Sequence, residues 1–444
     1  MRFGCGLGVV LAAGSTVWRD DPQGHSPPIH HNRRVTDHWD ATEATKSRSP
    51  FFPGQPVPVE FFVGRAKQAD RLLRRGAQQV AAGKPTAFFV EGDYGIGKSS
   101  LVTYAQRLAE DDFGLLPVYV TLGGCKTIED VAARVVEATL SSATNDKAGD
   151  KLREWLARYV GEQQLFGFRI NLQALRADAP NFSSPQGMLR FFRDALAKVA
   201  DSGVTGFFLV LDEVNGIAGD PTFSIFLKSF VDENGVTGSP VPMLLTVCGT
   251  EDKRREMIAR HQPVDRVFDV VHVDPMTRAE TDEFFSRAFR SARIEVADEA
   301  FPLLWAYSAG LPKIMQMLGD NAFWMDRDGT VTMDDVSEAV VATAEEVGRK
   351  FVDQQVYNEL RGDHYQAILD VIGQKDPFER TFSRSEIMAT LTEPQKKVFD
   401  NFLRRMTQLQ VIRKGGRAGE YEFNVLMVRF YIHIAARRRI ASGG

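Results

Sequence analysis

The sequence predicts an α/β protein in which a parallel sheet with helices on both faces is followed by an all-α region and a small domain of helices and a hairpin. Three observations support this architecture. An apolar strand at residues 87–90 runs into a glycine-rich loop and then into a helix. A second strand, residues 207–211, contains only apolar residues, as expected for a strand buried on both faces of a parallel sheet. Helical segments without intervening strands follow from residue 278.

The glycine-rich loop has the spacing G-x-x-x-x-G-K-[ST] of a phosphate-binding P-loop, between the strand and the helix that this motif requires. Glycines let the backbone curl so that successive N–H groups point at phosphate oxygens, and the helix that starts near Lys98 adds its positive end. Lys98 is expected to reach the β- and γ-phosphates, and the Ser99 hydroxyl to ligate Mg²⁺. The residues expected to hold the nucleotide are Gly92, Asp93, Tyr94, Gly95, Ile96, Gly97, Lys98, Ser99 and Ser100. The alternative is an ordinary glycine-rich turn between a strand and a helix.

Composition indicates a globular protein of several domains. The chain has 444 residues, a length that suggests about three domains, and it is 43% hydrophobic and 25% charged. The net charge of −4 gives the whole chain no basic signature for nucleic acid, but residues 375–444 hold 14 Lys and Arg against 7 Asp and Glu. Cys5, Cys125 and Cys248 are far apart and odd in number, which predicts neither a disulfide framework nor a zinc site and fits a reducing cytoplasm. No apolar stretch reaches membrane-spanning length, so no membrane association is expected.

Residues 1–57 are predicted to form a disordered N-terminal arm, because from residue 18 onward they are rich in Pro, Ser, Asp and Arg and lack a periodic apolar pattern. Residues 18–57 contain four histidines, but no cysteine or regular carboxylate spacing in this stretch supports a metal site. The opening Met1–Val17 has a short apolar core behind a single arginine. Its glycine content and weak positive region disfavour a targeting signal, and a misassigned start codon fits equally well.

The elements after the P-loop alternate between strands and helices. A strand at residues 115–121 precedes a helix at 128–140, and a helix at 185–200 leads to the apolar strand. Residues 141–182 mix polar linkers with an amphipathic piece and are interpreted as an insertion.

Two carboxylates, Asp212 and Glu213, emerge where the apolar strand ends, which is the edge at which open α/β sheets bind ligands. In a P-loop protein Asp212 would hold the Mg²⁺ shell. Glu213 would polarise the attacking water, since that role needs a carboxylate near the metal rather than on it. An acidic pair that caps a helix is the alternative.

Two further strand-like runs follow, at residues 241–250 and 267–273. The first is expected to place a polar residue beside the γ-phosphate, and Thr250 is the candidate, with Thr246 in reserve; a threonine at a strand end otherwise serves as a helix cap. Arg266 lies between the two runs, where an arginine is otherwise a solvated residue or part of a local ion pair.

These motifs in this order resemble an AAA+ ATPase, over about residues 58–440. The resemblance extends to the origin-initiator-type and archaeal-type ATPases, with the STAND NTPases close behind. It implies a P-loop NTPase core that binds ATP and Mg²⁺, and it implies that Arg266 acts as an arginine finger on a neighbouring subunit. The segment that ends in Val63, Gly64 and Arg65 resembles the stretch that packs against adenine, so Val63 is expected to contact the nucleotide.

The region after residue 275 resembles the helical lid of this superfamily, with helices expected at residues 278–292, 297–308, 312–326 and 333–347. The third helix begins Gly-Leu-Pro-Lys, similar to the Gly-x-Pro-Arg sensor motif. Proline in the first turn fixes the helix start, so Lys313 is expected to point at the nucleotide. Lysine in place of arginine keeps the charge but loses the bidentate fork.

The C-terminal part predicts a winged helix. A helical stripe near residues 365–372, a capped helix from about 382 and a third helix at about 393–409 precede a basic, glycine-rich hairpin at 411–423. Lys397 and Arg404 share a face of the third helix. A basic helix beside a basic wing is typical of modules that hold double-stranded DNA. Winged helices also serve as protein-docking or autoinhibitory modules.

The predicted domains are an arm at residues 1–57, an ATPase core at 58–275, a lid at 276–350 and a winged helix with a basic tail at 351–444. We expect a cytoplasmic ATPase that hydrolyses ATP slowly, as a conformational switch coupled to DNA binding, loading or remodelling, and that works with copies of itself or a partner ATPase. The alternatives are a STAND-like signalling or defence switch and a protein that binds nucleotide without turnover.

Overall fold

The computed structural model describes residues 61–142, 181–357, 362–377, 379–409 and 411–442, together with 46, 48–55, 58, 154, 155 and 360. Most of the predicted arm and most of the predicted insertion therefore lie outside the described residues. Among the described helices, none has both the length and the apolar character needed to cross a bilayer.

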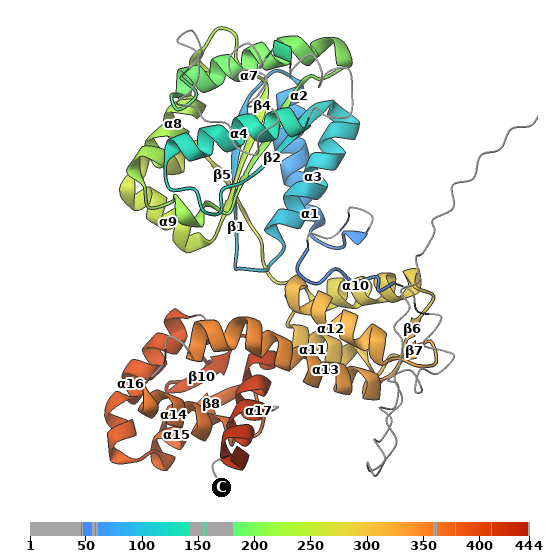
Figure 1. Ribbon diagram of the computed structural model, residues 1–444, viewed down its shortest axis with the longest axis vertical. Helices are drawn as coiled ribbons and strands as arrows, with labels where there is room; N and C mark the ends of the chain where they lie inside the picture. Colours follow the sequence, from blue (N-terminus) through green and yellow to red (C-terminus); the bar gives the residue numbers. More distant parts are fainter. Residues whose placement is uncertain are drawn as a thin grey trace, which may run out of the picture. The chain divides into compact units, whose positions relative to one another are not determined.

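The predicted parallel sheet is confirmed (Figure 1). Its strand order is β2-β3-β4-β1-β5, and every neighbouring pair is parallel. The strands are β1 (Thr86–Glu91), β2 (Leu115–Thr121), β3 (Gly206–Asp212), β4 (Met243–Gly249) and β5 (Asp269–His272). Because parallel strands end at one edge, this order brings the P-loop after β1 close to the carboxylates after β3.

Helices cover both faces of the sheet (Figure 1). One face packs against α1 (Ala66–Arg71), the π-helical turn η3 (Leu72–Ala77), α2 (Gln78–Ala81) and α3 (Lys98–Phe113). The other packs against α4 (Ile128–Ser142), α7 (Pro185–Val199) and α8 (Pro221–Val236). In β3, Phe208 and Val210 belong to the first face and Leu209 and Leu211 to the second. The alternation of a strand therefore directs Asp212 to the face of α3, the helix that begins with the P-loop lysine.

Short elements complete the core. These are the 3-10 helices η5 (Ala200–Ser202), η6 (Val214–Gly216) and η7 (Gln262–Val267), and the α-helix α9 (Glu251–Arg260). Thr250 caps α9, as its side chain accepts a hydrogen bond from the Lys253 N–H.

The four expected lid helices are present as α10 (Arg278–Ser291), α11 (Phe301–Ser308), α12 (Pro312–Met325) and α13 (Met333–Val347). Thr277 and Thr332 start α10 and α13 with capping boxes that close on Glu280 and Asp335. A two-stranded parallel ladder of β6 (Glu295–Val296) and β7 (Thr330–Val331) was not predicted.

The C-terminal part begins with the π-helical η8 (Gly348–Tyr357). It continues with α14 (Asp363–Gly373), β8 (Thr381–Ser383), α15 (Arg384–Thr390), α16 (Glu393–Gln408), β9 (Ile412–Lys414), β10 (Glu420–Phe423) and α17 (Leu426–Ser442). The three strands form an antiparallel sheet in the order β8-β10-β9. Phe382 and Ser383, expected to start a helix, belong to a strand instead, because they pair with β10.

One hydrophobic cluster runs without interruption from the lid into this C-terminal part. Val347 at the end of α13, Val352 and Val356 in η8, and Ile432 in α17 all belong to it. The Tyr431 hydroxyl also donates to Asp353, 2.8 Å away. The lid and the C-terminal part therefore share a core, whereas the sheet has clusters of its own.

The segment just before the parallel-sheet domain packs on α10 and α12, a contact that the prediction of an arm did not include. Phe51 is only 4% exposed, and its ring contacts those of Phe284, Phe285 and Phe289. The backbone N–H of Phe52 donates to the side-chain oxygen Oε1 of Gln316 in α12, 2.7 Å away.

Replacing Phe51 by alanine should lower the free energy of unfolding by about 3 kcal/mol, because the substitution empties a ring-sized volume inside the lid. Denaturant unfolding of the full chain, followed by circular dichroism, measures the change. Trp324→Ala is the matched control, since this lid aromatic is 48% exposed and its loss should cost much less. Equal effects of the two substitutions would contradict the anchoring role of Phe51.

Candidate active site

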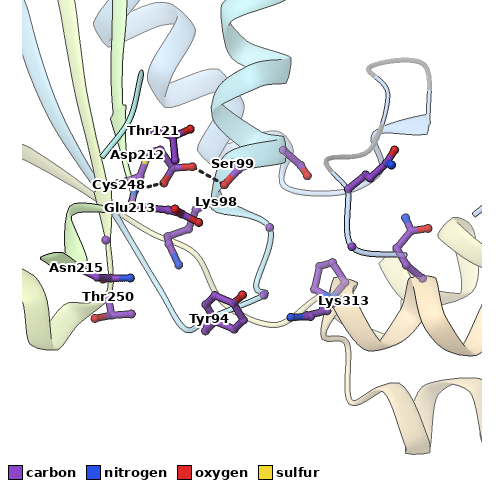
Figure 2. Close-up of a pocket in the computed structure, with 18 of the residues that line it drawn as sticks. Tyr94, Lys98, Ser99, Thr121, Asp212, Glu213, Asn215, Cys248, Thr250 and Lys313 are labelled. Atoms are coloured by element: carbon purple, nitrogen blue, oxygen red, sulfur yellow. Dashed lines mark hydrogen bonds between the residues drawn. The ribbon is translucent and has the colours of Figure 1, made fainter. Parts of the chain in front are cut away.

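A pocket of about 380 Å³ lies where the P-loop, the ends of β2, β3 and β4, and the lid helix α12 meet (Figure 2). This volume is in the usual range for small-ligand sites. The predicted residues that line it are Tyr94, Gly95, Gly97, Lys98, Ser99, Ser100, Asp212, Glu213, Thr250 and Lys313. Lining residues that were not predicted are Phe52, Gly54, Gln55, Tyr119, Thr121, Asn215, Cys248, Gly249, Pro312 and Gln316.

The P-loop has the curled backbone that its sequence predicts. Gly95 and Gly97 have φ angles of 75° and 92°, a region that residues with a Cβ rarely adopt. α3 begins at Lys98, whose ammonium donates to the Gly92 and Asp93 carbonyls, each 2.9 Å away. Burial lowers the pKa of Lys98.

Gly92, Asp93 and Ile96 belong to the loop but do not line the pocket. Ile96 is instead a core residue, 1% exposed, on the α3 side of the sheet. Its side chain anchors the loop, while its backbone carbonyl faces Arg65, described below.

Ser99 and Asp212 are brought together as predicted, with the serine hydroxyl donating to Asp212 Oδ2 at 2.6 Å (Figure 2). The Tyr119 hydroxyl donates to the same carboxylate oxygen, and the Glu213 N–H donates to Oδ1 at 2.8 Å. Burial, and then the charge of Asp212, raise the pKa of Tyr119.

A hydroxyl and a carboxylate side by side are the hard oxygen donors that suit Mg²⁺. No cluster of three or more His, Cys, Asp or Glu side chains that could hold a metal by itself occurs among the described residues. The donor set therefore fits a cation that takes its remaining ligands from phosphate and water.

Glu213 is exposed and has a φ of 58°, which turns its backbone at the end of β3. A Cβ placed on Gly123, in the loop after β2, would come within 2.6 Å of its Oε2. Glu213 therefore lines the pocket beside Asp212, whereas the hydrogen bond to Ser99 is made by Asp212.

Thr250 lines the pocket as well as capping α9, with 3.4 Å between its Oγ1 and the Lys253 nitrogen. Thr246, the reserve candidate, is fully buried within β4 and does not line the pocket. The two threonines differ in their position along the chain, since Thr246 lies in the middle of β4 whereas Thr250 lies just past its end, at the edge of the sheet where the phosphate loop is.

The lid contacts the P-loop through the start of α12. Gly310, with a φ of 68°, turns the chain into Pro312 at the first helical position. The Lys313 N–H donates to the Gly95 carbonyl at 3.3 Å, and its ammonium lies 4.4 Å from the centre of the Tyr94 ring (Figure 2). Lys313 is thus at the pocket, as predicted from its position after the proline.

Val63 lies beside the main pocket rather than in it. It is 4% exposed and lines a hollow of about 30 Å³ that shares Gly97, Ser100, Pro312 and Gln316 with the main pocket. Arg65 also lines this hollow and donates through Nη2 to the Ile96 carbonyl at 2.5 Å. Burial lowers the pKa of Arg65 to about 10. Its Nη1 is buried without a partner in the described part of the chain, so a donor is left at the end of the pocket away from Asp212.

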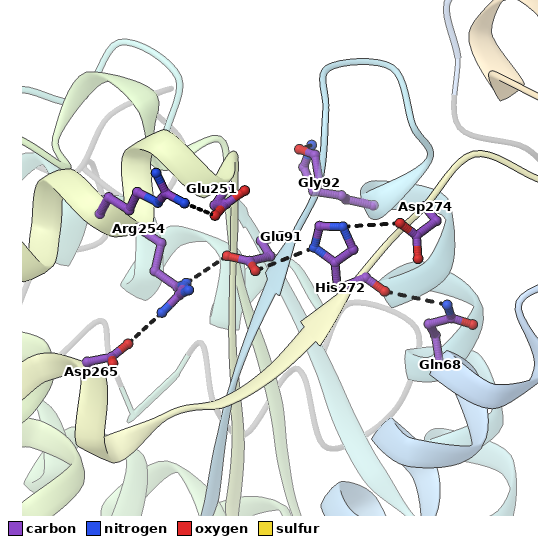
Figure 3. A network of polar contacts seen from close by, with 10 residues as sticks. Gln68, Glu91, Gly92, Glu251, Arg254, Asp265, His272 and Asp274 are labelled. Atoms are coloured by element: carbon purple, nitrogen blue, oxygen red, sulfur yellow. Dashed lines mark hydrogen bonds and ion pairs between the residues drawn. The ribbon is translucent and has the colours of Figure 1, made fainter. Parts of the chain in front are cut away.

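Arg266 is exposed on η7 and does not line the pocket of its own chain. The arginine that is held nearby is Arg254, which joins Glu91 to Asp265 with two contacts of 2.6 Å (Figure 3). His272 Nδ1 lies 3.4 Å from the other Glu91 oxygen. Burial opposes the charge of Arg254, but the hydrogen bonds and charges of Glu91 and Asp265 outweigh it and raise its pKa. The last residue before the P-loop is therefore tied to the loop that carries Arg266.

Some of the residues missed by the sequence analysis had a usable signal. Tyr119 and Thr121 are two positions apart in a predicted strand, so the sequence predicts that their side chains lie on one face of the sheet. The sequence does not predict that this strand pairs with β3, which is what places the two side chains beside Asp212. Phe52 and Gln316 gave no signal, since 264 positions separate them in the sequence.

The fold and site define a P-loop NTPase. Residues 62–244 match the family model described as AAA ATPase domain. This part of the chain is therefore similar to an AAA ATPase domain, and the predicted resemblance is confirmed.

Two solved structures show the same fold at low sequence identity. The Walker-type ATPase of Pyrococcus abyssi is similar with a TM-score of 0.53 and 15% identity, over 84% of this chain and 96% of that one. The ORC2 protein of Aeropyrum pernix, solved as ADPNP and ADP complexes, is similar with a TM-score of 0.56 and 11% identity, over 88% of this chain and 96% of that one. No curated protein matches the sequence.

Proposed function

We propose that this protein binds ATP with Mg²⁺ between its core and lid and hydrolyses it slowly, as a conformational switch. One observation carries the proposal: a single pocket is lined by the P-loop lysine, the Ser99–Asp212 pair, Glu213 and the lid residue Lys313. Hydrolysis needs these groups around one phosphate. The adjoining hollow is too small to hold the base, so Val63 and the donor Arg65 Nη1 would contact the base from beside the main pocket.

Each residue has a role that follows from its position. Lys98 and the loop N–H groups bind the phosphates, and Ser99 and Asp212 hold the cation and its water. Bound Mg²⁺ would neutralise charge on the phosphates. In this proposal Glu213 orients and polarises the attacking water, and Thr250, which lines the same pocket, contacts the γ-phosphate.

The switch follows from the lid contact. Lys313 touches the P-loop through its backbone and reaches Tyr94 with its side chain, so it can add its charge to a bound triphosphate. When the γ-phosphate leaves, this attraction weakens and the lid is free to open. We propose that Arg266, exposed beside the Arg254 bridge, completes the site of a neighbouring copy or of a partner ATPase.

We further propose that residues 351–444 form a winged helix that binds double-stranded DNA. The order α14-β8-α15-α16-β9-β10 with an antiparallel sheet supports this assignment. Lys397 and Arg404 on α16 and Lys414 and Arg417 beside the hairpin are all exposed. In this proposal their positive charges contact the phosphates of the duplex.

The alternative, a STAND-like signalling switch whose winged helix is a docking module, has one observation in its favour. The C-terminal part shares its core with the lid, and Arg438 of α17 pairs with Glu345 of α13. Such contacts would hold a resting state.

Turnover of ATP with and without duplex DNA, across a salt series, distinguishes the two functions. DNA should stimulate turnover at low salt, and the stimulation should fall steeply as salt rises, because each phosphate contact releases counterions. The double substitution Lys397→Ala with Lys414→Ala should remove most of the stimulation. Arg190→Ala with Lys228→Ala removes the same charge from the surface of the ATPase core and should not. Turnover indifferent to DNA would favour the signalling alternative.

A further inference from the structure

Tyr119 is a polar residue of the pocket that the predicted mechanism does not use. It lies on β2, and its ring packs against the apolar cluster on the α3 side of the sheet. The register pairs Thr121 with Asp212 and Tyr119 with Val210, so all four residues belong to neighbouring positions on one face. The Tyr119 hydroxyl thereby reaches the Asp212 carboxylate from a strand and not from the P-loop.

Asp212 receives three hydrogen bonds with different origins. Ser99 and Tyr119 both donate to Oδ2, and the Glu213 N–H donates to Oδ1. Asp212 is 4% exposed, so the orientation of its carboxylate depends on these donors rather than on solvent. The Ser99 oxygen is itself a candidate metal ligand and would turn toward a bound cation, whereas Tyr119 belongs to the strand β2 of the sheet and would keep its place.

We propose that Tyr119 is a positioning residue for magnesium, whose hydroxyl fixes the Asp212 carboxylate in the orientation that receives the cation's water shell. This inference rests on the proposed function, because it presumes that Mg²⁺ enters with the nucleotide. Partners that orient a metal-binding group typically contribute 10-fold or more to metal affinity.

The test is the binding of a fluorescent ATP analogue to the full chain, measured in EDTA and across a Mg²⁺ titration. Tyr119→Phe removes only the hydroxyl. In EDTA the Tyr119→Phe variant should bind the analogue with the affinity of the wild type. The Mg²⁺ concentration that gives half of the maximal increase in analogue binding should be about 10-fold higher for the variant. Tyr365→Phe is the matched control, since it removes a hydroxyl that contacts Asn401 in the C-terminal part, and its titration should be unchanged.

A double-mutant cycle with Asp212→Asn separates positioning from a general structural effect. If Tyr119 acts through Asp212, Tyr119→Phe should produce no further shift in the Asp212→Asn background. A Tyr119→Phe titration identical to the wild type would overturn the inference and leave the proposed function standing, as would an equal loss of affinity with and without Mg²⁺. A wild-type chain that binds no nucleotide, or binds it without regard to Mg²⁺, would overturn both.

Discussion

Lys98→Ala should lower the affinity for ATP by at least about 100-fold, because the ammonium would make two charge-assisted hydrogen bonds to phosphate, worth about 1.5–3 kcal/mol each. Burial already lowers the pKa of this lysine, which means that the charged form is less favourable in the loop than in water. The negative charge of a bound phosphate would stabilise the charged form. Titration of a fluorescent ATP analogue measures the loss.

Lys228→Ala is the control, since this lysine pairs with Asp232 on the surface of α8. Its affinity for ATP should be that of the wild type. Thermal unfolding of each variant shows whether the fold is kept, because Lys98 also joins two carbonyls of the loop. Undiminished affinity in a folded Lys98→Ala variant would refute the nucleotide site.

Glu213→Gln should reduce turnover about 100- to 10,000-fold while ATP stays bound, because the amide keeps the size of the side chain but cannot accept a proton from water. Asp212, Ser99 and Lys98 remain in place, so affinity should change little. Single-turnover hydrolysis of radiolabelled ATP, with filter retention of the bound nucleotide, separates the two quantities.

The control is Glu233→Gln, at a half-buried position of α8 where the side chain accepts a hydrogen bond from Gln186. This variant should hydrolyse ATP at the wild-type rate. Equal turnover before and after the Glu213 substitution would exclude this carboxylate as the base. Absence of turnover in the wild type, with binding intact, would favour a protein that uses nucleotide without hydrolysis.

The parts of the site that the sequence predicts are those whose geometry is local. The P-loop conformation follows from glycine spacing between a strand and a helix, and the Asp212–Glu213 turn follows from the end of an apolar strand. The meeting of Ser99 with Asp212 is predicted as well, because parallel strands share one carboxyl edge.

The remaining parts depend on pairings that no local pattern encodes. Tyr119 reaches Asp212 only because β2 lies next to β3, and Phe51 enters the lid across more than two hundred residues. The Arg254 bridge likewise needs α9 to lie against the end of β1. DNA binding, the finger role of Arg266 and the domain boundaries stay predictions.

The continuous hydrophobic core joins the lid to the C-terminal part, so these two parts of the chain should move together as one body. Close-packed interiors shift between discrete arrangements and do not stretch, so a movement of α12 would be transmitted to α17 as well. Under the proposed switch, loss of the γ-phosphate would therefore reposition the C-terminal part together with the lid.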